Sequence, residues 1–370
     1  MMTADKKTVG LYVHIPFCRS KCPYCDFYSF FPRPETVDRY IEKICSDIKD
    51  SPYRFDTVYI GGGTPSFIGE ERIARIVSSA DIAENDEITV ECNPSDTGNP
   101  DKEFDFSVLK SAGVNRISMG LQSAVDSERK ALGRRAGKDE VSRALERSVK
   151  SGIDNISLDL MLGIPGQTEK SLRESLDFCI SSGAKHISAY ILKIEDGTFF
   201  GKNREKIILP DDDETADLYL AASEALKSAG FAHYEISNFA LPGYESRHNL
   251  KYWRSEEYLG LGPAAHSFIG GRRFYFERDI EKYITGAGPV DDGEGGGERE
   301  YIMLALRLSE GIAFEKYSEK YGKELSGDFK NRCGFYASYG FGILTSGCFS
   351  LTEKGFLISN SIISDLVDYL

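Results

Sequence analysis

Three cysteines with the spacing of a metal centre lie near the N-terminus, at Cys18, Cys22 and Cys25. The pattern is C-x3-C-x2-C, and no fourth cysteine follows nearby in the sequence. An iron–sulfur cubane has four iron corners, and proteins usually hold each corner with a thiolate. Three thiolates leave one iron open, where it can bind a small molecule and pass it an electron. The spacing therefore predicts a 4Fe–4S cluster with an exchangeable ligand.

Two other uses of these cysteines compete with a cluster. Zinc prefers four nitrogen or sulfur ligands; His14 could be the fourth, although its spacing matches no common zinc motif. Disulfides are typical of oxidising compartments, but residues 1–9 lack the apolar core of a signal peptide. We therefore expect a cytoplasmic protein with reduced thiols. The other five cysteines are expected to be small buried residues: Cys45, Cys92, Cys179, Cys333 and Cys348.

Charge and hydropathy exclude two classes of partner. The 370 residues carry a formal net charge of −13, whereas nucleic-acid binders usually present a basic face. No apolar run approaches the ~18–20 residues that a membrane-spanning helix needs. We expect neither nucleic acid as a partner nor a transmembrane segment.

The elements that position the cysteines are predicted from short apolar segments that alternate with amphipathic ones. Helical periodicity is seen at 35–49, 138–150 and 168–182. The predicted strands cover residues 11–16, 57–63, 87–94, 116–123, 155–165 and 186–195. Six β-then-α units imply a parallel sheet, too short for an eight-stranded barrel. We predict a partial (β/α)6 TIM-like barrel in the α/β class, with an open doubly wound sheet as the alternative.

Polar and glycine-rich motifs follow the ends of these strands. They are Gly-Gly-Gly-Thr-Pro at 61–65, Glu-Cys-Asn-Pro at 91–94, Gly-Leu-Gln-Ser at 120–123, and Asp159 with the loop 163–167. Sites in parallel α/β folds lie at the carboxyl ends of strands. The motifs and the cysteine loop are therefore expected to lie together at the carboxyl-terminal end of the predicted barrel.

The remainder of the chain changes character. Residues 213–228 read as a helix, 231–239 and 270–276 as strands, 298–308 and 313–321 as helices, 342–350 as a hairpin, and 360–370 as a last helix. The glycines at 293–297 read as a linker or loop. The predicted organisation is a barrel domain at 1–240, a connecting β-rich segment at 241–297, and a smaller α+β, winged-helix-like module at 298–370.

Several side chains in these motifs could serve a charged cofactor. Glu91, Gln122, Arg134 and Asp159 are each most often structural when taken alone, but together they supply the polar groups that such a ligand needs. His248 stands in the sequence His-Asn-Leu-Lys-Tyr-Trp, beside the only tryptophan of the chain. A histidine among aromatic residues suits an axial ligand and apolar wall for a porphyrin. A histidine satisfied in the core is the alternative, and His266 is a second candidate.

The motifs together resemble a known family. The cysteine segment 12–27, the motifs at 61–65, 91–94 and 120–123, Asp159, and Leu-Thr-Glu-Lys-Gly at 351–355 are similar to those of radical S-adenosylmethionine (SAM) proteins, in the family of oxygen-independent coproporphyrinogen III oxidase. The resemblance implies SAM at the open iron. It implies that the cofactor is contacted by Tyr12 and Tyr24 beside the cluster, by Gly62, Gly63 and Thr64 at its methionine part, and by Glu91, Gln122, Arg134 and Asp159 around the remainder.

Two features favour the HemW-type heme chaperone branch of that family. The oxidase branch has a further cysteine two residues after the third, where this chain has Phe27. The chaperone branch has an aromatic residue there and a His-Asn-x-x-Tyr-Trp motif associated with heme, which residues 248–253 match. The resemblance thus predicts a protein that binds heme through His248 and transfers it to an acceptor protein, which no motif identifies. Radical decarboxylation of coproporphyrinogen III, and radical SAM chemistry on another substrate, are the alternative functions.

Overall fold

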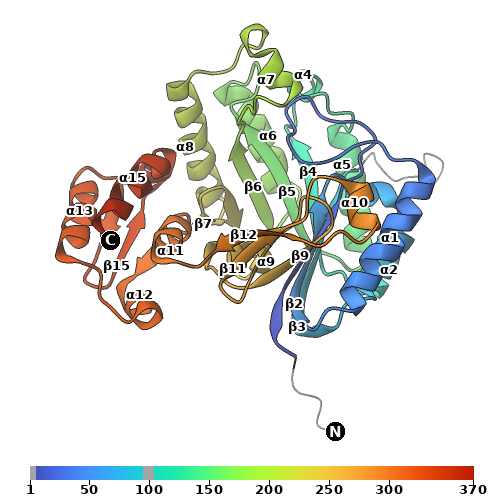
Figure 1. Ribbon diagram of the computed structural model, residues 1–370. Helices are drawn as coiled ribbons and strands as arrows, with labels where there is room; N and C mark the ends of the chain where they lie inside the picture. Colours follow the sequence, from blue (N-terminus) through green and yellow to red (C-terminus); the bar gives the residue numbers. More distant parts are fainter. Residues whose placement is uncertain (1–5, 95–103) are drawn as a thin grey trace.

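One large sheet organises the protein. The structure, a computed structural model, describes residues 6–94 and 104–370. Its main sheet has 12 strands in the order β12-β11-β10-β9-β1-β2-β3-β4-β5-β6-β8-β7 (Figure 1). The parallel centre consists of β1 Thr8–Ile15, β2 Arg54–Gly62, β3 Ile82–Cys92, β4 Arg116–Gln122, β5 Asn155–Leu162 and β6 His186–Ile191. All six predicted strands are confirmed in type and order.

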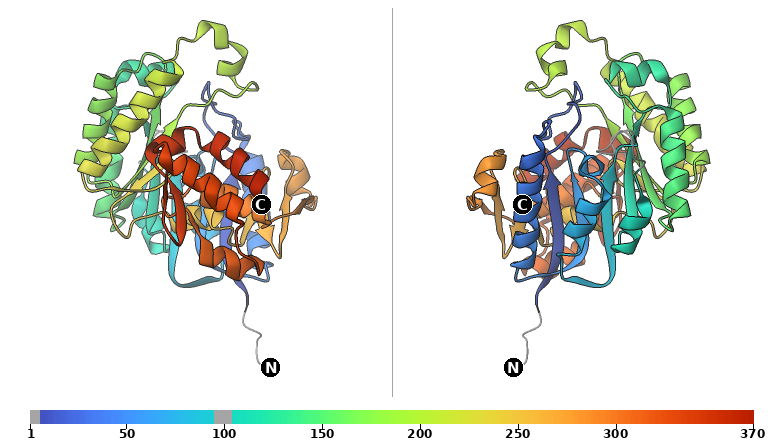
Figure 2. Two further views of the ribbon diagram at one scale, coloured as in Figure 1. Left: turned by 90° about the vertical axis from the view of Figure 1, so that its left-hand side faces the viewer. Right: turned by 90° about the vertical axis from the view of Figure 1, so that its right-hand side faces the viewer.

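The parallel strands form a partial barrel. β1 pairs with β9 (Tyr258–Leu261) and β6 pairs with β8 (Asn238–Ala240), so β1 and β6 do not pair with each other. The helices that follow the parallel strands lie along the outer face of the curved sheet (Figure 2). A doubly wound sheet would carry helices on both faces, whereas here the inner face lines cavities. The partial-barrel prediction is confirmed over the doubly wound alternative.

Side chains alternate between the two faces of each parallel strand, as the pleat requires. Val9, Leu11, Val13 and Ile15 of β1 are fully buried in the main apolar core. The inner face is polar, and its residues include Tyr12, Tyr59, Glu91, Arg116, Ser118, Asp159, His186, Ser188 and Tyr190. A TIM barrel is ordinarily filled by branched apolar side chains. This sheet instead encloses a polar interior.

The predicted helices of the barrel are confirmed with small changes at their ends. They are α1 Pro34–Lys49, α5 Lys138–Lys150, α6 Glu169–Ser181 and α8 Asp212–Ser228. Thr168 caps α6 by accepting a hydrogen bond from the Ser171 amide, which satisfies one of the orphan donors of the first turn.

The remaining helices are shorter. They are α2 Glu70–Val77, α3 Phe106–Ser111, α4 Asp126–Ala131, α7 Phe199–Lys202, α9 Arg247–Trp253 and α10 Ile280–Ile284, with 3₁₀ turns at Pro65–Ile68 and Arg204–Lys206. Among residues 6–94 and 104–370, no helix has the length and apolar character that crossing a membrane requires.

The strands flanking the parallel centre differ in part from expectation. The single strand predicted at 231–239 is wrong, because the chain folds back at residues 236–237 to form the hairpin of β7 (Ala232–Glu235) and β8. On the other side, β9, β10 His266–Ile269, β11 Arg272–Tyr275 and β12 Val290–Glu294 extend the sheet beyond β1. The glycine-rich segment 293–297 ends β12, and the Tyr321 hydroxyl donates to the Gly296 carbonyl at 2.8 Å. Hydrogen bonds therefore hold this segment in place.

The C-terminal module is a small α+β unit. It contains the helices α11 Glu298–Ala305, α12 Phe314–Tyr321, α13 Gly327–Ser338, α14 Glu353–Leu357 and α15 Ser359–Leu366, a final 3₁₀ turn Val367–Tyr369, and the strands β13 Ile312–Ala313, β14 Gly342–Leu344 and β15 Cys348–Leu351. The strands form a separate sheet in the order β13-β15-β14. The module lies beside α8 and β7 (Figure 1), where the Ile236 amide donates to the Arg307 carbonyl at 2.9 Å. The winged-helix-like prediction is confirmed.

Candidate functional site

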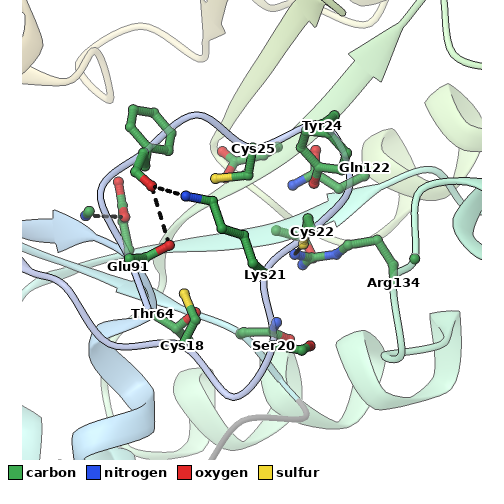
Figure 3. Close-up of a pocket in the computed structure, with 18 of the residues that line it drawn as sticks. Cys18, Ser20, Lys21, Cys22, Tyr24, Cys25, Thr64, Glu91, Gln122 and Arg134 are labelled. Atoms are coloured by element: carbon green, nitrogen blue, oxygen red, sulfur yellow. Dashed lines mark hydrogen bonds between the residues drawn. The ribbon is translucent and has the colours of Figure 1, made fainter. Parts of the chain in front are cut away.

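The three predicted cluster cysteines lie on the loop between β1 and α1 and line one cavity of about 180 Å³ (Figure 3). Each is partly exposed. The Cys18 Sγ lies 3.3 Å from the Thr64 Oγ1, and the Arg134 Nη1 lies 3.9 Å from the Cys22 Sγ. The Cys25 amide donates to the Cys22 carbonyl at 3.1 Å, a turn that brings these two cysteines together. The folded loop thus presents all three thiols to one space.

The arrangement of these thiols suits a cluster better than a single ion. Within the described ranges, no group of three or more His, Cys, Asp or Glu side chains is close enough to share one metal ion. A cubane needs no such closeness, because each thiolate binds a different iron. Arg134 beside Cys22 adds a positive charge next to what would be an anionic cluster. The residues present therefore fit a 4Fe–4S cluster.

The other cysteines behave largely as predicted. All eight lie in the part of the chain that the structure describes, and none forms a disulfide. Cys45, Cys92, Cys179 and Cys333 are buried. Cys348 is partly exposed, because its strand β15 belongs to the small sheet of the C-terminal module rather than to the main core.

The glycine motif after β2 supports the cysteine loop. Gly62 has φ +112°, and a Cβ there would lie 2.4 Å from the His14 Nδ1, so only glycine fits. The Gly63 amide donates to the Ile15 carbonyl at 2.8 Å. The next residue, Thr64, contacts Cys18 as described. Gly62, Gly63 and Thr64 therefore line the cysteine cavity and also hold its loop.

His14 is satisfied within the fold and does not face the thiols. Its Nε2 lies 2.9 Å from the Tyr28 carbonyl, which can only accept, so Nε2 carries the proton. Its Nδ1 then accepts from the Tyr12 hydroxyl at 2.9 Å. Burial lowers the His14 pKa to about 4. His14 does not line the cysteine cavity and belongs to no group of the described residues that could share a metal ion, so the structure does not support its interpretation as a fourth zinc ligand.

Two buried carboxyl groups lie on the inner face of the barrel, at Glu91 and Asp159. The Tyr59 hydroxyl donates to the Glu91 Oε1 at 2.7 Å, and the Gly62 amide donates to its Oε2 at 3.0 Å. Ser118 donates to the Asp159 Oδ1 at 3.2 Å. Burial is the main cause that raises the pKa of Glu91 to about 7 and the pKa of Asp159 to about 6. Both groups line the cysteine cavity, where a cationic ligand would favour their ionised form.

Gln122, Arg134 and Tyr24 complete the wall of this cavity. Gln122 has φ +67°, an uncommon conformation for a residue with a side chain, at a bulge in β4. Its Oε1 accepts from the Tyr190 hydroxyl at 2.7 Å. The Arg134 Nη2 donates to the Gly120 carbonyl at 2.8 Å. Strand ends β2 to β5 and the cysteine loop thus meet, as the strand-end rule predicted.

A larger cavity of about 870 Å³ continues from the cysteine cavity into the barrel. Tyr24, Cys25, Glu91, Asp159 and Tyr190 are among the residues that line both spaces. Tyr12, which was expected beside SAM, lines the larger cavity and not the cysteine cavity. The two spaces therefore form one continuous interior with two differently built ends.

His248 lies at the end remote from the thiols, on α9. Its side chain is 1% exposed and lines the larger cavity. The Nδ1 lies 2.8 Å from the Thr57 Oγ1, and the Nε2 lies 2.8 Å from the Tyr252 hydroxyl. The ring stacks on Tyr59 with 5.5 Å between centroids. Burial lowers the His248 pKa to about 3, so the imidazole is neutral, the form that ligates metals.

Hydrogen bonds from distant strands anchor α9. The amides of Arg247 and His248 both donate to the Glu87 carboxylate, each at 3.0 Å. The Ser246 amide donates to the Tyr234 hydroxyl at 3.3 Å, and that hydroxyl lies 2.8 Å from the His186 Nε2. His266, the second candidate, is exposed on β10, stacks on Tyr275, and does not line the described cavities that hold His248 or the cysteines.

Sequence inspection missed several residues that build the interior. They include Thr57, Tyr59, Glu87, Arg116, Ser118, His186 and Tyr190. Their signal was the two-residue period of the strands, which puts polar side chains opposite the apolar core face. An alternating strand normally reads as half solvent-exposed, so the polar half was not taken as a site.

Comparison with known proteins first defines a class. Residues 12–179 match the model of the Radical SAM superfamily, and residues 299–358 match the HemN C-terminal domain. The solved structure of coproporphyrinogen III oxidase (HemN) from Escherichia coli, described as a radical SAM enzyme, superimposes with a TM-score of 0.80 at 20% identity, covering 99% of this chain and 91% of that one. At that identity the likeness shows the shared fold. The chain is a radical SAM protein.

More similar relatives then define the family. The heme chaperone HemW of Bacillus subtilis is 36% identical over 95% of this chain and 97% of its own length. HemW of Lactococcus lactis is 31% identical over 96% and 97%, and HemW of Escherichia coli is 38% identical over 74% and 79%. The chain belongs to the HemW family, as Phe27 and the motif at 248–253 predicted.

Proposed function

We propose that this chain is a heme chaperone that takes heme into the larger cavity, with His248 as an iron ligand, and passes it to an acceptor protein. The observation that carries the proposal is the continuous interior that joins the cysteine loop to His248. The name of its relatives as heme chaperones supports the same function. No motif identifies the acceptor, and we propose the cytoplasmic location that the sequence led us to expect.

In this proposal Cys18, Cys22 and Cys25 hold a 4Fe–4S cluster, and SAM binds beside it. When bound, such a cluster supplies an electron that can cleave SAM. The chain's own residues hold the cofactor: Gly62 and Gly63 allow close approach of the backbone, and Glu91 and Asp159 offer acceptors for its ammonium and hydroxyl groups. Arg134, Gln122, Thr64 and Tyr24 form the remaining wall, and Tyr12 approaches from the larger cavity.

One nitrogen of His248, Nε2, could bind an iron, and a hydrogen bond with Tyr252 covers it. If Nδ1 donates to Thr57, the Nε2 lone pair accepts from Tyr252 and is the atom that an iron would take. As folded, the hydrogen bonding of His248 is that of a satisfied core histidine. Its place in the wall of the cavity supports the ligand role, which requires Tyr252 to release Nε2.

Anaerobic purification followed by iron, sulfide and heme quantitation on one sample tests the proposal. We expect iron and sulfide in the ratio of a 4Fe–4S cluster and one heme per chain after heme loading. Incubation with coproporphyrinogen III, SAM and a reductant tests the enzyme alternative, and formation of protoporphyrinogen would overturn the chaperone function. Release of 5′-deoxyadenosine that depends on a non-porphyrin molecule would identify a different radical SAM enzyme.

A further inference from the structure

Arg116 is a buried cation for which the fold provides no ion pair. It is the first residue of β4, and its side chain is 2% exposed. Its Nε has no hydrogen-bond partner among residues 6–94 and 104–370, and its guanidinium forms no ion pair with a carboxylate of those residues. Arginine cannot discharge by losing a proton, and Glu91 and Asp159 interact with it electrostatically without forming an ion pair with it. The guanidinium is therefore open to an anionic partner from outside the chain.

The carboxyl groups nearest along the sheet are already engaged. Glu91 accepts from Tyr59 and Gly62, and Asp159 accepts from Ser118, as described above. Arg116 lines the larger cavity but not the cysteine cavity. Gly120 lies four positions further along the same face of β4, which is about 13 Å of strand length. A ligand held at the thiols by its own carboxylate would thus leave Arg116 unpaired.

The surroundings of Arg116 favour a flat aromatic acid. Tyr12, Tyr59 and His248 line the same cavity, with 6.2 Å between the centroids of the two tyrosines. A guanidinium recognises a carboxylate through two parallel hydrogen bonds. Phe27 and Ile191 line the same cavity and are 65% and 38% exposed, and the exposed charged residues Asp26, Lys193, Glu195 and Arg278 line it as well. The cavity therefore combines a buried cation among aromatic side chains with apolar and charged side chains that reach solvent.

We propose that Arg116 binds a propionate of heme, so that the porphyrin enters the barrel carboxylate first with its apolar edge toward Phe27 and Ile191. This assignment rests on the proposed heme chaperone function and adds the orientation of the cargo. A charged pair buried in this cavity contributes more than an exposed one, because water screens it less. The apolar edge of the porphyrin is then the part that an acceptor protein meets first.

Titration of the cluster-reconstituted, full-length protein with two probes tests the assignment. The probes are hemin and hemin dimethyl ester, which keeps the iron and ring but lacks the carboxylates. We expect the wild type to bind hemin about 30-fold more tightly than the ester. Arg116→Gln should lose that preference by weakening hemin about 30-fold while changing ester affinity less than about twofold. Arg116→Lys should keep part of the preference because it keeps the charge.

Arg72→Gln is the matched control, because Arg72 pairs with Asp38 on the surface at 2.7 Å. It should leave both affinities unchanged. Equal binding of hemin and ester by the wild type overturns the Arg116 assignment while leaving the chaperone proposal standing, and this arm needs no variant to fold. Retention of the full preference in Arg116→Gln overturns it as well. Failure of the wild type to bind either probe overturns both proposals.

Discussion

The two ends of the interior differ in how ready they are for a ligand. At one end, three partly exposed thiols face a shared space. At the other, His248 is 1% exposed and both of its ring nitrogens are hydrogen-bonded. The cysteine end is preformed, whereas the histidine end must exchange one hydrogen bond before it can take iron. In the proposed function, the cofactor would bind at an open loop, whereas heme would bind at a helix whose histidine is covered by a hydrogen bond.

The hydrogen bond that covers the His248 Nε2 contributes less free energy than the bonds that hold α9 to Glu87. A typical neutral hydrogen bond such as Tyr252 to His248 contributes about 1 kcal/mol net, whereas bonds to a charged group contribute about 1.5–3 kcal/mol. Two amides of α9 donate to the charged Glu87. Displacing Tyr252 from the His248 Nε2 should therefore cost less free energy than detaching α9 from Glu87.

The largest effect is expected from removing a thiol at the preformed end. Cys22→Ala should reduce cluster content after anaerobic reconstitution to a small fraction of the wild type, because a cubane with two protein ligands is poorly held. Iron and sulfide analysis measures this. Cys348→Ser is the control, since Cys348 lies in the C-terminal module. Equal iron content in the two variants would show that the cysteine loop does not hold the metal.

Loss of the α9 anchor should have the next largest effect. Glu87→Ala removes the acceptor of the buried His248 amide and of the partly buried Arg247 amide, and should lower the free energy of unfolding by about 2–3 kcal/mol. Chemical denaturation monitored by circular dichroism measures the change. Glu281→Gln, which removes a surface ion pair with Arg39, should change stability by less than about 0.5 kcal/mol. A Glu87→Ala variant as stable as this control would show that α9 is not anchored through Glu87.

Affinity for SAM should depend on pH through the two carboxyl groups of the cysteine end. Burial raises the pKa of Glu91 to about 7 and of Asp159 to about 6. A cationic ligand favours the ionised carboxylates, so binding should weaken as pH falls and each group takes up a proton. Equilibrium dialysis of the reconstituted protein should show about tenfold weaker binding at pH 6 than at pH 8. Glu91→Gln should flatten this dependence, and an unchanged slope in that variant would remove Glu91 from the SAM site.

The smallest effect is expected from removing the hydrogen bond that covers the His248 Nε2. Tyr252→Phe keeps the ring but uncovers the His248 Nε2, so heme affinity should rise about fivefold. Titration followed by heme absorbance measures it. Phe276→Leu, outside the His248 cavity, serves as an aromatic control and should leave affinity unchanged. A fall in affinity for Tyr252→Phe would mean that Tyr252 contributes to heme binding instead of covering the ligand atom.

Local sequence patterns predicted the cysteine end of the interior well. The thiols belong to one loop, and the groups around them follow strand ends that a parallel sheet brings together. Those relations need only strand type and direction, which short apolar segments reveal. The same reasoning recovered the parallel strands, their helices and the winged-helix-like hairpin.

The histidine end of the interior could not be predicted in the same way, because it depends on contacts between residues far apart in the sequence. Glu87 and His248 are 161 residues apart, and Thr57 and His248 are 191 apart. The burial of His248 and of Arg116 follows from how α9 and the inner face of the sheet meet. A polar residue in an alternating strand looks like a surface residue until the curvature of the sheet is known. The hairpin of β7 and β8 was missed for a related reason, since its two-residue reversal lies within one β-rich segment.

Heme titration of the reconstituted wild type, His248→Ala and His266→Ala tests the central claim most directly. We expect one heme per chain with the same absorbance spectrum in the wild type and in His266→Ala. In His248→Ala we expect weaker binding and a changed spectrum, because the axial nitrogen is lost. Unchanged stoichiometry and spectrum in His248→Ala would contradict the account and remove His248 from the heme site.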